Sequence, residues 1–284
     1  MPLKVGSTRF GLVGGSTVHS RGFGRGTAPN PVFRRSPRIP VVAVEAEAVR
    51  FLHTSNGTPN PMSVPFLDLK LQYASLKSPI DEKLESVVSS QYFVLGPEVQ
   101  GLEEELSEYI GVSSAVGVAS GTDALLLPLR ALKPRAGDEV IVPSFTFFAT
   151  AGAAWNSGFT PVFCDVDPDT FNVTLEALEA VRTERTRAVV PVHLYGQMAP
   201  MAEICSWAEE KGIFVLEDAA QAIGARQRVA EESSEGSRAV KWRMAGAWGD
   251  AGAFSFFPTK NLGGFGDGGL VTARDEDFGE VISK

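Results

Sequence analysis

Several residue types are scarce in this 284-residue sequence, and their scarcity excludes whole classes of protein. Only two cysteines are present, Cys164 and Cys205, so a disulfide framework is excluded and reduced thiols are expected. The three histidines are scattered, and no CxxC or HExxH spacing predicts a metal site. No apolar run reaches the roughly 18–20 residues of a membrane span, so we expect no membrane contact. The net charge of −8 argues against a nucleic-acid partner.

The charge is unevenly distributed between the first 61 residues and the rest. Residues 1–61 carry a net charge of +6, and the remainder carries −14. The leading segment has no helical or strand period, so we expect a disordered extension. Its arginine-rich, acid-poor composition is typical of an organelle transit peptide, whereas Met62, directly before the first regular segment, favours a mis-assigned start. We expect a cytoplasmic protein, with organelle targeting by residues 1–61 as the alternative.

From Val64 onward the sequence alternates between short β-rich runs and helical patterns. The predicted strands are Ala115–Ala119, Glu139–Val142, Pro161–Asp165, Ala188–His193, Ile213–Glu217 and Ala253–Phe257. The predicted helices are Ile80–Val88, Val99–Tyr109, Thr122–Leu132, Phe147–Ser157, Leu175–Arg182 and Met201–Lys211. Because the strands are nearly continuous apolar runs, we predict an α/β fold with a mostly parallel sheet covered on both faces.

Residues that follow the predicted strands are the candidates for chemistry, since ligands of such sheets bind beyond the carboxyl ends of the strands. Ser120–Ala124 opens a helix whose free amides favour a phosphate, although an ordinary N-cap is the plainer interpretation. Asp218 follows one strand and is either structural or directed at a ligand. Lys260 lies between a strand and the glycine-rich segment Gly263–Gly269. It is a solvated side chain or, if desolvated, an amine that attacks carbonyl carbons.

The glycine-rich segment also matches the dinucleotide pattern G-x-G-x-x-G over Gly264–Gly269. That fingerprint must follow a strand and open a helix, whereas Leu270–Thr272 has the character of a strand. We therefore reject a nicotinamide-dependent oxidoreductase.

Nine segments, in order, resemble those of the DegT/DnrJ/StrS family of aminotransferases, over roughly Met62 to Lys284. These segments are Phe66–Lys70, Leu95–Val99, Ser120–Leu125, Gly137–Val140, Pro143–Phe147, Pro191–Gly196, Glu217–Gln221, Ser255–Leu262 and Gly266–Gly269. The resemblance implies an enzyme with the large domain of the fold type I transferases that depend on pyridoxal 5′-phosphate (PLP). It also implies a homodimer, and transfer of an amino group from glutamate to a nucleoside-diphosphate keto-sugar in the biosynthesis of amino sugars, polysaccharides or glycosides.

The resemblance assigns a role to each matching residue. Lys260 matches the lysine that holds PLP covalently and then moves protons. Asp218 matches the carboxylate that pairs with the pyridinium nitrogen, and Gln221 the residue that faces the 3′-oxygen. Phe147 matches the aromatic ring that stacks on the cofactor. The phosphate cup is matched by Gly121, Thr122, Asp123 through its amide, and Ser255.

The chain departs from the family pattern at two places. Segment 226–248 is longer and more charged than the usual short hairpin, so it is a solvated surface insertion or a retained non-coding stretch. The chain also stops soon after Lys260, and we expect residues 62–284 to be a large domain that lacks the C-terminal small domain. A non-catalytic regulatory or scaffold module, or an inactive fragment, is therefore the alternative function.

Overall fold

The computed structural model describes residue 65, residues 67–232 and residues 238–284. The chain divides into Met1–Val64 and Pro65–Lys284, and the described residues belong to the second unit. The expected extension over residues 1–61 lies outside the described residues. Within them, no helix combines the length and the apolar character needed to cross a membrane.

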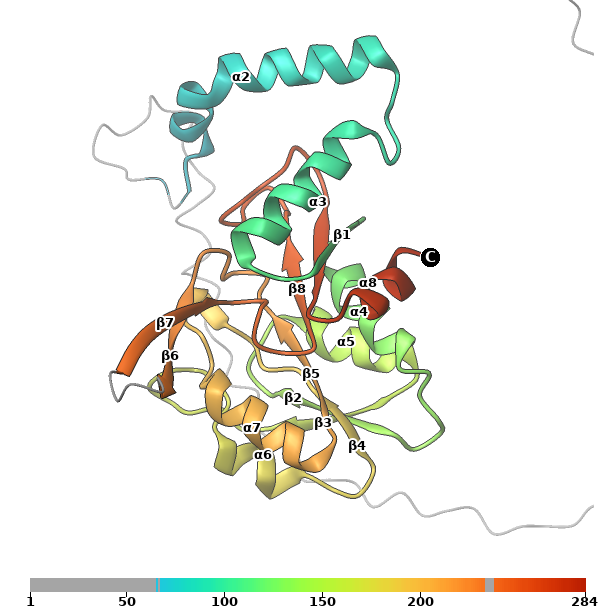
Figure 1. Cartoon of the computed structure of the whole chain (residues 1–284), viewed down its shortest axis with the longest axis vertical. Coiled ribbons are helices and arrows are strands. Elements are labelled where there is room, and N and C mark those ends of the chain that lie inside the picture. The colour runs from blue at the N-terminus through green and yellow to red at the C-terminus, as the bar shows by residue number, and fades with distance from the viewer. Residues whose placement is uncertain (1–64, 66, 233–237) are drawn as a thin grey trace, which may run out of the picture. The chain divides into compact units, whose positions relative to one another are not determined.

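A seven-stranded sheet with the spatial order β1-β9-β8-β5-β4-β2-β3 forms the centre of the fold (Figure 1). Its strands are β1 (Ser114–Val118), β2 (Glu139–Pro143), β3 (Thr160–Cys164), β4 (Thr186–Val189), β5 (Phe214–Asp218), β8 (Ala251–Ser255) and β9 (Gly269–Ala273). Neighbours from β8 to β3 pair in parallel, whereas β9 is antiparallel to both β1 and β8. The predicted α/β fold with a mostly parallel sheet is confirmed, with β9 as the antiparallel exception.

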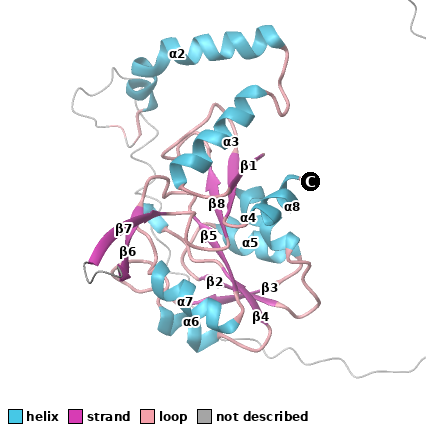
Figure 2. Ribbon diagram, in the orientation of Figure 1, coloured by secondary structure: helices cyan, strands magenta, loops and turns pink. Residues whose placement is uncertain are grey.

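Helices cover both faces of this sheet and give three layers (Figure 2). Helices α4 (Gly121–Ala131), α5 (Phe148–Ser157) and α8 (Glu276–Ser283) pack on one face, and α6 (Leu175–Val181) and α7 (Met201–Lys211) on the other. Strand β2 shows the cause, because all five of its residues are buried. Its Val140 and Val142 side chains join the α4–α5 core, and Ile141 joins the α6–α7 core.

Local sequence signals fix the ends of these helices. The Ser120 side chain accepts a hydrogen bond from the Asp123 amide and caps α4. Helices α5 and α7 end at Gly158 and Gly212, whose φ angles of 99° and 65° lie in the left-handed region that glycine tolerates. The predicted end of the 201–211 helix is therefore confirmed. Pro200 is the N-cap residue of this helix.

Two helices precede the sheet, α2 (Leu69–Ser90) and α3 (Pro97–Ile110). The prediction of a helix over Ile80–Val88 only was too short, because α2 begins at Leu69 and continues through Pro79. None of its residues is buried, so the burial pattern that would have revealed its first half is missing from the sequence. The α3 boundaries extend the predicted Val99–Tyr109 by two residues before it and one after it.

Segment 226–248 contains a two-stranded antiparallel hairpin, β6 (Arg226–Glu232) and β7 (Arg238–Met244). The Gln227 side chain accepts a hydrogen bond from the Met201 amide, which ties the hairpin to the start of α7. On the hairpin, the guanidinium groups of Arg226 and Arg228 lie 5.2 and 6.0 Å from the centre of the Trp242 ring. Whether this hairpin is an insertion relative to other proteins stays a prediction.

Candidate functional site

A cavity of about 570 Å³ lies beyond the carboxyl ends of the sheet strands. Seven of the eight residues that the sequence singled out line it, and they come from loops after four different strands. These residues are Gly121 and Thr122 after β1, Phe147 after β2, Asp218 and Gln221 at the end of β5, and Ser255 and Lys260 at the end of β8. The topology therefore brings together residues that lie up to 139 positions apart in the sequence.

The α4 end of the cavity is suited to an anion. The first amides of α4 have no partner inside the helix, and the helix dipole adds a partial positive charge. Gly121 packs so closely against Ser255 that an added Cβ would lie 2.6 Å from the Ser255 Cβ. A residue without a side chain is thus required for the backbone of α4 to meet the end of β8, where both face the cavity.

Asp123 does not line this cavity. Its amide donates to the Ser120 hydroxyl oxygen at 3.1 Å, and the Ser120 hydroxyl donates to the Asp123 carboxylate at 2.9 Å. The predicted role of the Asp123 amide in a phosphate cup therefore competes with helix capping, and capping uses the amide here. The amides of Gly121 and Thr122 precede the capped position and are left for a ligand.

Asp218 is the deepest charged group of the site, with 5% of its surface exposed. Its Oδ2 accepts a hydrogen bond from the Thr150 hydroxyl at 2.8 Å, and its Oδ1 accepts one from the Ala220 amide at 3.3 Å. Burial raises the pKa of Asp218, and the hydroxyl of Thr150, the Ala220 amide and the positive charge of Lys260 act in the opposite direction. A cationic nitrogen beside this carboxylate would relieve the cost of burying its charge.

Gln221 and Lys260 present nitrogen atoms to the same cavity. The Gln221 Oε1 atom accepts a hydrogen bond from the Tyr195 amide at 2.7 Å, so its Nε2 amide is the group left to donate to a ligand. Among the described residues, no carboxylate lies within ion-pair distance of the Lys260 amine. Phe147 is the N-cap residue of α5 and is 71% exposed, which leaves its ring free to cover a planar ligand.

The sequence predicted no role for three further residues of the site, namely Thr146, Thr150 and His193. Thr146 and His193 line the cavity, and Thr150 lies behind Asp218. The available signal was a threonine in the apolar start of α5, where a hydroxyl needs a buried partner. Its partner Asp218 is 68 positions away, so the contact itself had no local signature.

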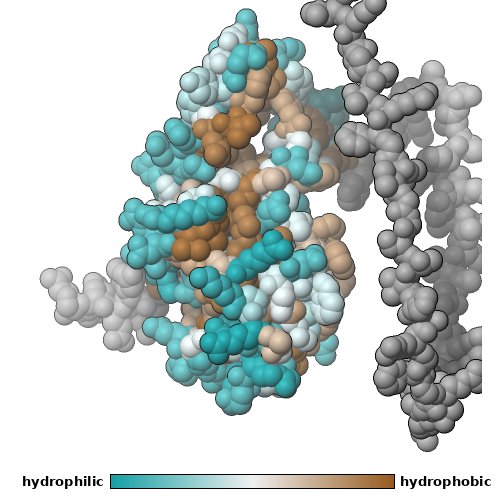
Figure 3. All heavy atoms as spheres, turned by 90° about the vertical axis from the view of Figure 1, so that its right-hand side faces the viewer, coloured by the Kyte–Doolittle hydropathy of each residue, from teal (hydrophilic) through white to brown (hydrophobic). Residues whose placement is uncertain are grey.

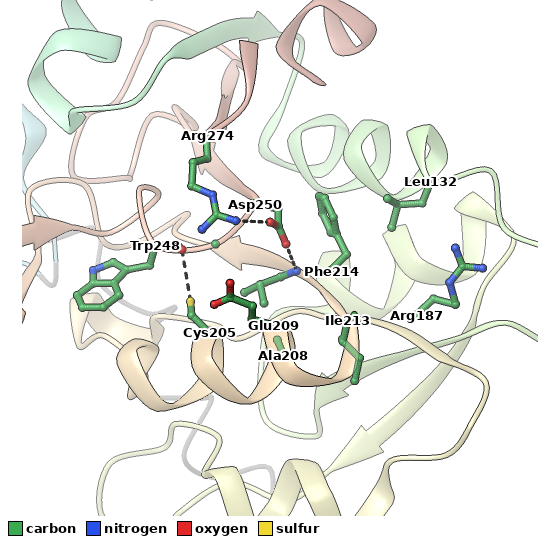
Figure 4. A pocket seen from close by; sticks show the side chains of 13 residues that line it. Leu132, Arg187, Cys205, Ala208, Glu209, Ile213, Phe214, Trp248, Asp250 and Arg274 are labelled. Atoms are coloured by element: carbon green, nitrogen blue, oxygen red, sulfur yellow. Dashed lines mark hydrogen bonds and ion pairs between the residues drawn. The ribbon is translucent and has the colours of Figure 1, made fainter. Parts of the chain in front are cut away.

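A second hollow, of about 410 Å³, lies at the amino-terminal ends of the parallel strands, near the start of β5 (Figure 4). Two of its charged groups pair with each other, because Arg274 bonds to Asp250 at 2.8 Å, and Asp250 also accepts the Val215 amide. Burial raises the pKa of the Cys205 thiol to about 12, and the thiol donates to the Trp248 carbonyl. This cysteine is a poor nucleophile at neutral pH, so the hollow offers no comparable chemistry.

Comparisons with known proteins agree with this geometry. The sequence model of the DegT/DnrJ/EryC1/StrS aminotransferase family matches residues 75–284. Over 77% of this chain and 55% of its own length, the pleiotropic regulatory protein of Geobacillus stearothermophilus is 44% identical. The UDP-N-acetyl-3-dehydro-alpha-D-glucosamine 3-aminotransferase of Acidithiobacillus ferrooxidans is 45% identical over 76% of this chain and 55% of its own.

A solved structure gives the same result at the level of the fold. The structure of NtdA from Bacillus subtilis with bound cofactor PMP superposes with a TM-score of 0.66 at 30% identity, covering 78% of this chain and 47% of its own. The chain thus spans about half of the length of these relatives.

Proposed function

The chain belongs to the DegT/DnrJ/EryC1/StrS aminotransferase family, and on this premise we propose that its cavity serves amino-group transfer from glutamate to a nucleoside-diphosphate keto-sugar. Members of the family use PLP. The observation that carries the proposal is the arrangement of Lys260, Asp218 and the α4 N-terminus around one cavity of about 570 Å³. An amine, a buried carboxylate and an anion site are the three groups needed to hold the aldehyde, ring nitrogen and phosphate of PLP.

The donor set fits PLP in its chemistry as well as in its position. Among the described residues, the buried Asp218 carboxylate has two hydrogen-bond donors, one of them at 3.3 Å, and therefore retains capacity for a protonated ring nitrogen. The free Gln221 amide suits an oxygen acceptor. Gly121, Thr122 and Ser255 would hold the phosphate, and Phe147 would lie against the ring. When bound, PLP supplies an electron sink that stabilises negative charge on the substrate carbon.

The residues of the chain divide the remaining work among them. The Lys260 Nζ atom would hold the cofactor through its aldehyde carbon, and the amine would then move a proton between the substrate carbon that bears the nitrogen and that cofactor carbon. Asp218 would keep the ring nitrogen protonated by placing a negative charge beside it. The amides at the start of α4 orient the phosphate, so the reacting groups are held at Lys260.

A homodimer is part of the proposal. Large hydrophobic side chains are exposed along α2, at the start of α5 and in the segment Leu194–Gly196, among them Leu71 (76%), Phe148 (81%) and Tyr195 (71%). Figure 3 shows hydrophobic areas exposed on one side of the molecule. Monomeric proteins rarely expose extended apolar patches, and a second subunit would cover such surface.

A regulatory protein is the second candidate, since a relative that is 44% identical bears the name pleiotropic regulatory protein. Lys260, Asp218, Gln221 and Ser255 are all retained, which favours the enzyme. The two candidates differ in turnover, because a regulatory module need not release 2-oxoglutarate from glutamate.

The deciding experiment labels the cofactor lysine and then measures turnover. After loading with PLP, we expect visible absorbance, and borohydride reduction should fix the cofactor on Lys260 as mapped by peptide mass spectrometry. Lys260→Ala should abolish turnover while retaining part of the affinity for phosphate, because only the amine is removed. Labelling of a different lysine would refute the assignment.

The same loaded protein is then incubated with glutamate and a panel of nucleotide-linked keto-sugars, and products are detected by mass. Amination of at least one sugar is the expected result. Labelling of Lys260 without release of 2-oxoglutarate would favour the regulatory candidate.

A further inference from the structure

Two threonine hydroxyls connect the wall of the cavity to the buried face of Asp218. Thr150 is fully buried on α5, and its hydroxyl donates to the Asp218 Oδ2 atom at 2.8 Å. The Thr146 hydroxyl oxygen lies 3.1 Å from that of Thr150, and Thr146 lines the cavity. The three polar groups therefore form a continuous chain of hydrogen bonds.

The direction of this chain follows from counting protons. Each hydroxyl has one proton to donate, and a charged carboxylate can only accept. When Asp218 is ionised, Thr150 must direct its proton to Oδ2, so Thr146 must donate to the Thr150 oxygen. Oδ1 accepts the Ala220 amide at 3.3 Å and, within the described part of the chain, no other donor, so it remains the oxygen available to a ligand.

We propose that Thr150, supported by Thr146, is a positioning residue that holds Asp218 in its charged form and leaves Oδ1 for the ligand. The identity of that ligand rests on the proposed function. The chain of hydrogen bonds from Thr146 through Thr150 to Asp218, called the relay below, does not. A hydrogen bond to a charged acceptor is about twice as strong as one to a neutral acceptor, so the hydroxyl favours the carboxylate over the carboxylic acid.

Other groups that act on the charge of Asp218 are few. The positive charge of Lys260, in the loop after β8, favours the charged form, whereas burial opposes it. His193, in the segment before η1 (Leu194–Gly196), is the other titratable group that acts on Asp218, and its ring nitrogens bond to the Ala199 amide and to Glu217. Helix α5 contains no titratable residue, so its contribution to Asp218 comes through the Thr150 hydroxyl. Removing that hydroxyl should therefore shift the titration of Asp218 upward without altering any other charge.

The test compares two buried threonines in the chain without cofactor. Thr150→Val removes the proposed relay, and Thr272→Val is the matched control, because Thr272 is also fully buried and donates to the Gly246 carbonyl at 2.6 Å, away from the cavity. The free energy of unfolding is measured by urea denaturation from about pH 4 to about pH 8 for each variant.

The two variants should differ in the shape of the pH dependence. Because the charged form of Asp218 loses its donor, Thr150→Val should lose progressively more stability as pH rises, with a change of about tenfold or more in the protonation equilibrium. Thr272→Val should lose the same stability at every pH. Thr150→Ser should restore the wild-type profile, and Thr146→Val should shift it in the same direction by less.

Parallel curves for Thr150→Val and Thr272→Val would overturn the proposal, since both hydroxyls would then be merely structural. If Thr150→Val does not fold, an unchanged profile for Thr146→Val would overturn it instead. A second measurement, the affinity for PLP followed by its absorbance, should weaken about tenfold or more in Thr150→Val at neutral pH and recover in Thr150→Ser. If Thr150→Val shows the expected pH-dependent loss of stability but the wild-type protein binds no PLP, the proposed function is refuted and the role of Thr150 is supported.

Discussion

On one face of β5 the Glu217 carboxylate accepts four hydrogen bonds, whereas on the other face the next residue, Asp218, accepts two. Glu217 receives the amides of Gly246, Trp248 and Gly249 at 2.7–2.9 Å and the His193 Nε2 atom at 2.8 Å. The faces differ because side chains alternate along a strand, with Val215 in the α7 core and Leu216 in the α4–α5 core. Two adjacent buried carboxylates are thus prepared for different tasks.

Hydrogen-bond accounting also fixes the state of the Glu217 pair. The His193 Nδ1 atom accepts the Ala199 amide at 3.2 Å and therefore carries no proton, so Nε2 holds the proton and donates to Glu217. Glu217 is saturated with donors and joins β5 to the turn before β8. Asp218 keeps accepting capacity in the cavity. A satisfied carboxylate stabilises the fold, and an unsaturated one is available for a ligand.

The largest expected effect is on stability, from Glu217→Ala. This change leaves three buried amides and His193 without their acceptor, and breaking such a buried charged network costs about 3–5 kcal/mol. Urea denaturation monitored by tryptophan fluorescence measures the loss. A loss below about 1 kcal/mol would mean that the Glu217 side of the comparison is wrong.

Asp218→Asn should have the opposite profile to Glu217→Ala, with a loss of activity and no loss of stability. Under the proposed function, the rate of amino-group removal from glutamate should fall at least ~100-fold, since the charge meant for the ring nitrogen is lost. The free energy of unfolding should stay unchanged or rise, because a costly buried charge disappears. If this variant is instead destabilised as strongly as Glu217→Ala, Asp218 is a structural residue.

The smallest effect is the pH dependence of stability. Burial raises the pKa of Asp218 above its ordinary value of 3.8, so the folded state binds this proton more tightly than the unfolded state. The resulting stability is fully present below pH 3.8 and is lost as pH rises through the raised value, by about 1.4 kcal/mol for each unit of increase. Wild type minus Asp218→Asn, measured by denaturation across this window, should show that decline, and a flat difference would contradict it.

The sequence predicted the sheet well because its signals are local. Buried parallel strands such as β2 are continuous apolar runs, and the prediction Glu139–Val142 missed only Pro143. Helix α2 was predicted too short because no residue of it is buried and Pro79 normally ends a helix. Propensity rules fail where packing leaves no periodic trace.

The candidate site was partly predictable for the same reason. Asp218 and Lys260 each follow a strand in a recognisable motif, so their common location follows from the topology. Thr150 and His193 act through partners 68 and 24 residues away, which no local pattern encodes. The predicted phosphate contact of the Asp123 amide competes with a local hydrogen bond, because the Ser120 side chain, three residues away, accepts that amide.

Strand β9 has a consequence for the order in which the molecule is assembled. It is inserted between β1 and β8, and Ser114 pairs with Ala273, so β1 finds its neighbour only after β2, β3, β4, β5 and β8 have been synthesised. Such non-local pairing is slow, and an unpaired strand edge is prone to aggregation. Gly269 lies so near Ser120 that an added Cβ would be 2.4 Å from its carbonyl oxygen. The turn that we propose to bind the phosphate is therefore completed only when β9 is in place, after β2, β3, β4, β5 and β8 have been synthesised.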